Sequence, residues 1–277
     1  MSGTLTLVGT PIGNLSDFSP RAVAALEACD FIAAEDTRVT LTLLNHFGIR
    51  KPLISYFEHN KRERGEQICR KLEEGESAVL VTDAGMPAIS DPGEDLVALC
   101  HERGIPVTVI PGPCAGIAAL AVSGLPTGRF TFEGFLSVNR RSRREHLDAL
   151  VAEERTMVFY EAPHKLLSTL EDMLAAWGDR RLCLARELTK LHEEVNLTTL
   201  SAAVEHYRET PPRGEFVLVI HGAEMEKPQE YILDDAVQFA QTLMGDGLSA
   251  SDASKKAAAQ TGLKKGDIYR AVMQSKE

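Results

Sequence analysis

The sequence of 277 residues predicts an α/β protein with two α/β domains and a small helical tail at the C-terminal end. Three observations predict this class. Short apolar runs alternate with helical patterns over the first 120 residues. The alternation continues with a different spacing from about residue 130, and strand patterns are absent from residues 228–277. Strands that alternate with helices are typical of α/β domains.

The first domain is expected to contain a parallel sheet. Its strands are predicted at residues 5–8, 31–34, 53–56, 78–82 and 107–110, with helices at 21–28, 41–47, 64–73, 96–100 and 115–122. Ser19 and Pro20 are an N-cap and a first-turn proline, and Gly48 ends the second helix. Strands that are separated by helices pair in parallel, with right-handed crossovers.

A second α/β domain is expected from about Phe130. Its predicted strands are 130–135, 156–160, 182–185 and 216–220, and its predicted helices are 145–152, 166–177 and 200–207. The domains are therefore predicted at 1–122 and 123–225, with a helical tail at 226–277. Residues 248–269 of the tail have helix-turn-helix spacing. Packing of the tail onto the body is favoured over nucleic-acid recognition.

Composition excludes several classes of protein. Hydrophobic residues make up 44% and charged residues 25% of the chain, as in ordinary globular proteins. No apolar run approaches the roughly 20 residues that cross a bilayer, and no signal peptide is visible, so we expect a cytoplasmic protein without a membrane partner. The five cysteines lack close pair spacing, which argues against disulfides and a metal site. Most are expected in the core, with Cys114 the exception.

The net charge of −10 argues against a generic nucleic-acid binder. The basic residues are nevertheless clustered. Arg140, Arg141, Arg143 and Arg144, the arginine cluster, fall in a predicted linker before the helix at 145–152. Solvated surface is the more frequent role of any single cluster. The arginine cluster, however, lies beside a candidate site, and this position favours a role in contact with phosphates.

Four loops follow predicted parallel strands and are expected to converge on one crevice. They are residues 9–17, 35–38, 83–93 and 111–115. The loop Asp83–Gly93 contains two glycines, two prolines and two aspartates, which let backbone approach a ligand closely. Because the carboxyl ends of parallel strands share one edge, the crevice is the predicted ligand site.

Motifs that the sequence lacks exclude several classes of ligand. No Gly-x-Gly-x-x-Gly, Gly-Lys-Ser/Thr or Gly-x-Ser-x-Gly motif is present. A dinucleotide fingerprint, a triphosphate loop and a hydrolase nucleophile elbow are therefore excluded. A ligand with a bulky aromatic part and few phosphates fits these loops better.

The loop sequences at 9–15, 34–38, 83–93 and 111–115 resemble the tetrapyrrole methylase superfamily. Further matching motifs lie at residues 125–126, 129–136, 159–164, 185–190 and 214–215. The set is most similar to the branch that methylates small-subunit ribosomal RNA. The resemblance implies a two-domain α/β enzyme, with a mixed second sheet, that is usually a homodimer. It implies S-adenosylmethionine as cofactor and the ribose 2′-oxygen of a cytidine in the 16S rRNA decoding region as acceptor.

The resemblance also assigns site residues. The cofactor is expected to contact Ala84, Gly85, Met86, Ile89, Cys114, Ala115, Tyr160, Glu161, Ala185, Arg186, Gly214 and Glu215. Asn14, Asp36, Arg38, Glu187 and Lys190 are expected to face the substrate. Four positions depart from the family pattern: Met86 and Cys114 replace small hydroxylic residues, Gly9 replaces proline and Lys165 replaces arginine.

Transfer to a ribose hydroxyl requires alignment of donor and acceptor and help with loss of the hydroxyl proton. Asp36, Glu161 and Glu187 are candidate bases, and Lys190 or Arg38 are candidates to assist the hydroxyl or hold a phosphate. Ion pairs that shape loops are the alternative role for each. Two other functions remain open: a tetrapyrrole C-methyltransferase, and a non-catalytic ribosome-assembly factor.

Overall fold

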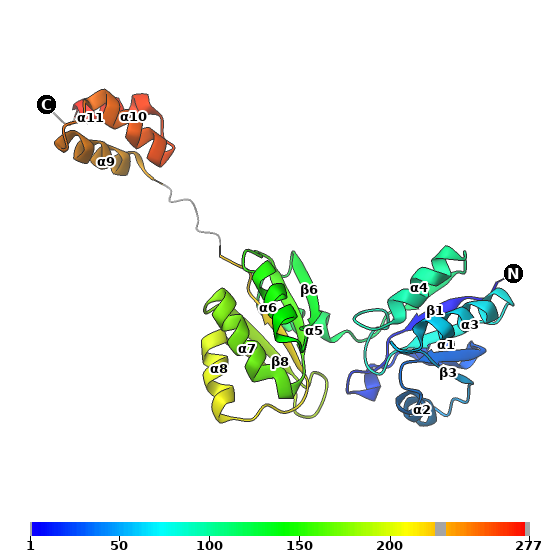
Figure 1. Ribbon diagram of the computed structural model, residues 1–277. Helices are drawn as coiled ribbons and strands as arrows, with labels where there is room; N and C mark the ends of the chain where they lie inside the picture. Colours follow the sequence, from blue (N-terminus) through cyan, green and yellow to red (C-terminus); the bar gives the residue numbers. More distant parts are fainter. Residues whose placement is uncertain (1, 225–230, 275–277) are drawn as a thin grey trace. The chain divides into compact units, whose positions relative to one another are not determined.

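A computed structural model describes residues 2–224 and 231–274 (Figure 1). The chain divides into two compact units, Met1–Ala223 and Glu224–Glu277. The predicted boundary between residues 225 and 226 lies outside the described residues, as do tail residues 226–230.

The first sheet is parallel throughout, as predicted. Its strands are β1 (Leu5–Val8), β2 (Phe31–Ala34), β3 (Leu53–Ser55), β4 (Ala78–Val81) and β5 (Val107–Ile110), in the order β3-β2-β4-β1-β5. The helices between them are η1 (Leu15–Asp17), α1 (Pro20–Ala28), α2 (Thr37–His46), α3 (Lys61–Glu73) and α4 (Gly93–Glu102). The Ser19 side chain caps α1 by accepting a hydrogen bond from the Ala22 N–H, 3.2 Å away.

Alternate strand residues separate the two faces of this sheet. Leu5, Phe31 and Leu80 pack with α3 and α4, whereas Val8 and Ile32 pack with α1 and α2. Strands β2 and β4 are buried on both faces, which explains their continuous apolar sequences. The result is a three-layer domain with helices on both sides of the sheet.

The order of the strands creates a switch point between β1 and β4. The connection from β1 leads through α1 to β2, and the connection from β4 leads through α4 to β5 on the opposite face. In open α/β sheets, ligands bind in the crevice at the carboxyl ends of such strands. The loops after β1 and β4 therefore border the crevice.

The second sheet is mixed, which confirms the predicted fold class. Its strands are β6 (Phe130–Phe135), β7 (Thr156–Glu161), β8 (Arg181–Arg186), β9 (Glu194–Thr199) and β10 (Phe216–Ile220), in the order β6-β7-β10-β8-β9. Only β6 and β7 pair in parallel. Helices α6 (Arg140–Ala149), α7 (Pro163–Trp177) and α8 (Leu200–Glu209) cover one face (Figure 1).

Helix α5 (Ala115–Val122) covers the opposite face of the second sheet. Its Ala119 and Leu120 pack with Val158 of β7 and Val217 of β10. The predicted first domain, residues 1–122, includes this helix. Because the helix packs on the second sheet, we propose that the boundary between the two α/β domains lies in the loop at residues 111–114.

Two local predictions were wrong. Strand β9 was not predicted, and its apolar side chains Val195 and Leu197 are 41% and 59% exposed. The arginine cluster is not a linker, because α6 begins at Arg140. Asn139 starts this helix early: its side chain accepts hydrogen bonds from the N–H groups of Arg141 and Ser142.

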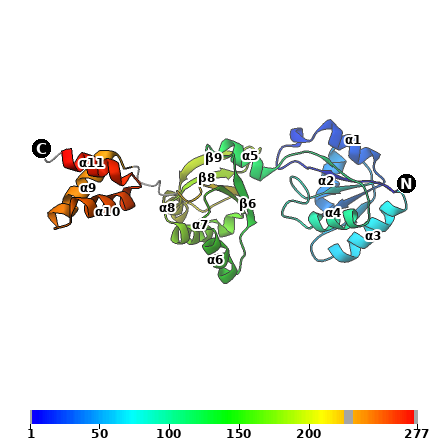
Figure 2. The ribbon, with the colours of Figure 1, turned by 90° about the horizontal axis from the view of Figure 1, so that it is seen from above.

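The C-terminal unit has a core of its own. Helices α9 (Leu233–Gly245), α10 (Ala250–Thr261) and α11 (Lys265–Gln274) lie against one another (Figure 2) and bury Ala236, Ala253, Ile268 and Val272 together. Gly262, with φ +72°, ends α10 in the left-handed region. Among the described residues, no helix has both the length and the apolar character needed to cross a membrane.

Candidate active site

The strand-end loops converge, as predicted. Thr10, after β1, and Gly85, after β4, exchange backbone hydrogen bonds of 2.9 and 3.1 Å. The Thr10 hydroxyl donates to the Thr82 carbonyl at 3.1 Å. These contacts hold the two loops together across the switch point.

The loop after β2 joins the same edge. The Thr82 hydroxyl donates to Glu35 at 2.6 Å, and the Asp36 backbone N–H donates to Asp83 Oδ1 at 3.0 Å. The ends of β1, β2 and β4 therefore form one connected polar framework.

The loop after β5 packs against the loop after β1 through two glycines. A Cβ atom built on Gly112 would lie 2.8 Å from the Gly9 Cα and carbonyl oxygen. The Gly112 N–H donates to the Met86 sulfur at 3.3 Å, and a Cβ on Gly9 would lie 2.7 Å from that sulfur. Gly9 thus leaves room for the Met86 side chain.

We expect Gly112→Ala to destabilise the protein by about 1–3 kcal/mol, because the added methyl group meets backbone that cannot move freely. It should also weaken binding of S-adenosylmethionine, the cofactor that the sequence resemblance implies, since the loop contacts Met86. Denaturant unfolding and calorimetry measure the two effects. Gly128→Ala is the matched control, because a Cβ there has no neighbour within 4 Å. Equal stability and affinity in both variants would show that the glycine contact is dispensable.

A cavity of about 500 Å³ opens where the first and second sheets meet the converged loops. Of the predicted site residues, twelve line it: Ala84, Gly85, Met86, Ile89, Cys114, Ala115, Tyr160, Glu161, Ala185, Glu187, Lys190 and Glu215. The cavity is also lined by residues that the sequence analysis did not assign: Ile12, Glu35, Thr82, Asp83, Ser90, Asp91, Phe135, Ala162, Pro163, Leu188, Phe216 and Val217. Asp83, Ser90 and Asp91 lie in the loop the sequence singled out and could have been found there.

The charge of the cavity is negative. Its lining includes six carboxylates, those of Glu35, Asp83, Asp91, Glu161, Glu187 and Glu215. Among the described residues that line it, Lys190 alone is basic. Such a lining favours a cationic ligand and disfavours one rich in phosphates.

Lys190 is held between two of these carboxylates. Its ammonium group donates to Glu187 Oε1 and Glu215 Oε2, both at 2.8 Å. Burial lowers the pKa of Lys190, but the two carboxylates outweigh burial and raise it overall. The hydrogen bond from Lys190 lowers the pKa of Glu187. Glu187 itself has φ +51°, a strained conformation of the kind that clusters at functional sites.

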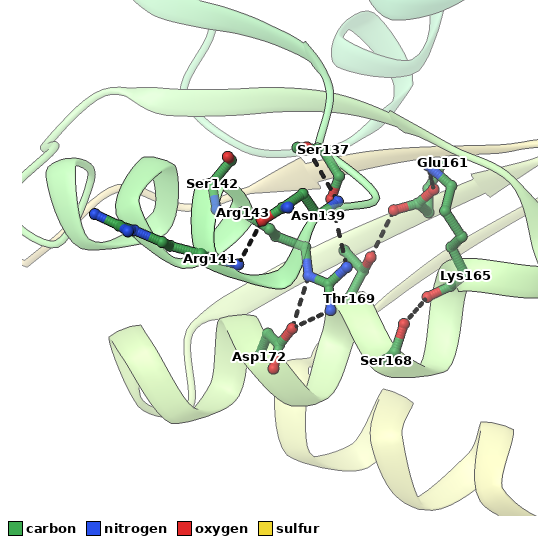
Figure 3. Close-up of polar contacts among 10 residues, drawn as sticks. All are labelled: Ser137, Asn139, Arg141, Ser142, Arg143, Glu161, Lys165, Ser168, Thr169 and Asp172. Carbon is green, nitrogen blue, oxygen red and sulfur yellow. Dashed lines mark hydrogen bonds and ion pairs between the residues drawn. The ribbon is translucent and has the colours of Figure 1, made fainter.

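Glu161 is fully partnered and buried (Figure 3). One carboxylate oxygen accepts hydrogen bonds from the Ala162 N–H at 2.9 Å and pairs with Lys165 at 3.0 Å. The other accepts from the Thr169 hydroxyl at 2.6 Å. This arrangement ties the end of β7 to the first turns of α7 and uses both oxygens of Glu161.

Asp36 and Arg38 lie outside the lining of the cavity. Both oxygens of Asp36 accept hydrogen bonds from Arg38, and the Oδ1 atom also caps α2 through the Arg38 N–H. The guanidinium hydrogen bonds lower the pKa of Asp36 to about 2. Asp36 therefore stays ionised and paired, while its backbone N–H positions Asp83.

Asp83 differs from these acids. Burial raises its pKa, and the nearby charges of Glu35 and Asp36 raise it further, against the hydrogen bond from the Asp36 N–H. That bond uses Oδ1 alone, and among the described residues no donor reaches Oδ2. Asp83 is thus a carboxylate with increased basicity and a free oxygen at the cavity.

Tyr160 joins the cavity to the second sheet. Its hydroxyl accepts a hydrogen bond from the Gly116 N–H at 3.0 Å, and burial, with the neighbouring Cys114, raises its pKa to about 12. The rings of Phe132 and Phe135 lie 5.2 and 5.4 Å from the Tyr160 ring. Phe135 is 56% exposed and offers an aromatic surface to the cavity.

The remaining predicted residues lie elsewhere. Arg186 pairs with Glu194 of β9 at 2.9 Å, and Asn14 caps η1 through the Ser16 N–H. Gly214 borders Glu187, because a Cβ there would lie 2.5 Å from the Glu187 side chain. None of the three lines the cavity. The other four cysteines are buried and Cys114 is partly exposed, as expected.

The arginines of the cluster point in different directions, as Figure 3 shows for Arg141 and Arg143. Arg143 is turned inward: its side chain is 11% exposed and pairs with Asp172 of α7 at 2.6 Å. Arg141 is 88% exposed and pairs with Glu145 at 2.8 Å. Arg140 and Arg144 are exposed. Three of the four arginines therefore remain available to solvent.

Comparison with known proteins identifies the class that this fold and cavity define. The family model described as Tetrapyrrole (Corrin/Porphyrin) Methylases matches residues 4–204. Solved structures share the fold. A diphthine synthase superposes with a TM-score of 0.61 at 14% sequence identity, and the match covers 81% of this chain and 92% of the diphthine synthase chain. A uroporphyrin-III C-methyltransferase from Thermus thermophilus, complexed with S-adenyl homocysteine, has a TM-score of 0.54 and 20% identity, covering 78% and 97%.

Curated relatives define the group more narrowly. A ribosomal RNA small subunit methyltransferase I from Synechocystis is 49% identical, covering 97% of this chain and 96% of its own. The protein of that name from Escherichia coli O157:H7 is 44% identical, covering 97% and 94%. The one from Thermotoga maritima is 48% identical, and its whole length matches 80% of this chain. The chain therefore belongs to the ribosomal RNA small subunit methyltransferase I family, which confirms the predicted resemblance.

Proposed function

We propose that this chain uses S-adenosylmethionine to methylate 16S ribosomal RNA of the small subunit. The ribose 2′-oxygen of a cytidine in the decoding region is the proposed acceptor. The observation that carries the proposal is the acidic cavity at the switch point, in a chain of this methyltransferase family. A methylation assay with purified small subunits and labelled S-adenosylmethionine tests it. Absence of label in the RNA would reject it.

The residues of the cavity fit S-adenosylmethionine. Apolar side chains such as Ile89 and Val217 suit an adenosine ring system, and the acidic lining suits a sulfonium cation. The fit to a nucleotide polyphosphate is poor, for the same electrostatic reason. When bound, the cofactor supplies the methyl group from its sulfonium.

Asp83 is our proposed acceptor for the proton of the 2′-hydroxyl. A neutral hydroxyl is a weak nucleophile, and a carboxylate with a raised pKa and a free oxygen is suited to remove its proton. Asp36 and Glu161, two of the candidates from the sequence, have both oxygens in hydrogen bonds, and the hydrogen bond from Lys190 lowers the pKa of the third candidate, Glu187.

Lys190 is proposed to hold the reacting hydroxyl or its neighbouring phosphate. Its charge lies at the wall of the cavity and is fixed by Glu187 and Glu215. Arg38, whose side chain is 89% exposed, is proposed to contact the RNA backbone, and Asp36 to fix Arg38 and Asp83.

The exposed arginines Arg140, Arg141 and Arg144 are proposed to contact RNA phosphates. Replacing all three with glutamine is expected to weaken binding to small subunits and to flatten its dependence on salt, because fewer counterions are released. Binding titrations at several salt concentrations measure both effects. Arg143→Gln does not belong in this variant, since Arg143 supports α6 through Asp172. Equal affinity and an equal salt slope would contradict the proposed contact.

Two further properties are proposed from the family resemblance. These are a homodimer and a cytoplasmic location, where small subunits are available. Light scattering of the purified chain measures the first directly. A monomer at the concentrations that support full activity would reject the homodimer.

A further inference from the structure

A second cavity, of about 490 Å³, adjoins the first. It lies between the loop that follows β1 and helix α2. Thr82 and Asp83 line both cavities, so the two meet at the end of β4. The carboxylate that we assign to proton transfer, Asp83, is therefore at the junction of the two cavities.

One face of α2 forms a wall of this second cavity. Val39, Thr42, Leu43 and His46 line it, at spacings of three, four and seven residues from Val39. These spacings place all four on the same side of a helix. Leu44, by contrast, is buried in the core beneath the sheet. Val39 is 44% exposed, so α2 leaves an apolar stripe uncovered.

The lining combines an apolar wall with polar groups at one end. Leu15, which is 43% exposed, adds to Val39 and Leu43. The imidazole of His46 is a flat ring that can stack on another ring. A flat heterocycle matches this chemistry.

We infer that the second cavity receives the base of the nucleotide that is methylated, with its ribose at the Thr82–Asp83 junction. The inference rests on the proposed function and adds the site that holds the acceptor. A base in this cavity must be unstacked from its neighbours in the RNA, as in other enzymes that act on single nucleotides. The ribose then lies beside Asp83, and the first cavity holds the donor.

Filling the second cavity tests the inference. Thr42→Trp places a large side chain in it, and Asn45→Trp places the same side chain on an exposed position of α2 that lines neither cavity. We expect Thr42→Trp to lower kcat/KM for small subunits by about 100-fold, because the base loses its site. Affinity for S-adenosylmethionine should stay within about twofold, as should every parameter of Asn45→Trp.

A smaller change guards against misfolding of Thr42→Trp. His46→Ala removes the stacking ring and should lower kcat/KM for small subunits by about 10-fold, with cofactor affinity unchanged. Activity of Thr42→Trp and His46→Ala equal to that of Asn45→Trp would overturn the inference and leave the proposed function intact. If the unsubstituted chain does not methylate small subunits, the proposed function fails, and the inference falls with it.

Discussion

Asp83→Asn is expected to reduce methylation of small subunits by about 10²–10⁴-fold, the usual contribution of a positioned base. Asparagine has the same shape and keeps the Oδ1 atom that accepts from the Asp36 N–H. The framework of the crevice should therefore remain with its stability unchanged, and the cofactor should still bind, because the other five carboxylates still line the cavity. Single-turnover methylation and calorimetry measure the two properties separately. Asp17→Asn, an exposed acid on η1 that lines neither cavity, is the control.

We also expect Asp83→Asn to change the pH dependence of methylation. Burial raises the pKa of Asp83, so the unsubstituted enzyme should lose activity as pH falls through that raised value and Asp83 becomes protonated. Activity is thus present above the pKa and lost below it. The residual activity of Asp83→Asn should lack this acid limb. An acid limb that persists in Asp83→Asn would assign it to another group.

Lys190→Ala has the second large expected effect, a loss of about 10²–10³-fold in turnover. The substitution removes the positive charge from the wall of the cavity and leaves the carboxylates of Glu187 and Glu215 without their shared partner. The RNA should be held less well in the reactive position, whereas the cofactor should still bind, because the lining becomes more negative. Turnover and cofactor affinity are measured on the same preparation.

The control for this variant is Lys61→Ala. Lys61 also bridges two acids, Glu58 and Asp95, but it lies on α3 and lines neither cavity. It should retain full turnover. Unchanged turnover in Lys190→Ala would remove Lys190 from the mechanism.

Sequence patterns predicted most of the strands, because their apolar runs are short and bounded by turn residues. The convergence of the four loops also followed from sequence, since parallel strands place their carboxyl ends on one edge. Strand β9 was not predicted because it is an edge strand, which pairs with β8 alone. Its sequence is polar at Glu194, Asn196 and Thr198, so it lacks the apolar run of a buried strand.

The place of Phe135 could not be read from residue spacing. In a regular strand, Phe132 and Phe135 would face opposite sides of the sheet. The pairing of β6 with β7 shifts by one residue between Phe132 and Gly134, which has φ +62°. This bulge brings both rings to the face of Tyr160, where Phe135 reaches the cavity.

The identity of the base could not be predicted from sequence either. Sequence motifs selected Asp36, Glu161 and Glu187 by residue type and position. Hydrogen bonds between residues far apart in the chain decide which carboxylate is free, as with Thr169 on Glu161. Only the folded chain distinguishes Asp83, whose pKa is raised by burial, from Glu187, whose pKa is lowered by its hydrogen bond with Lys190.

The most direct test of the central proposal is mass spectrometry of nucleosides from small-subunit ribosomal RNA, in cells with and without this chain. We expect 2′-O-methylation of one cytidine in the decoding region to disappear without the chain. The modification should return with the unsubstituted chain and not with Asp83→Asn. An unchanged ribose methylation pattern in cells that lack the chain would contradict the proposed function.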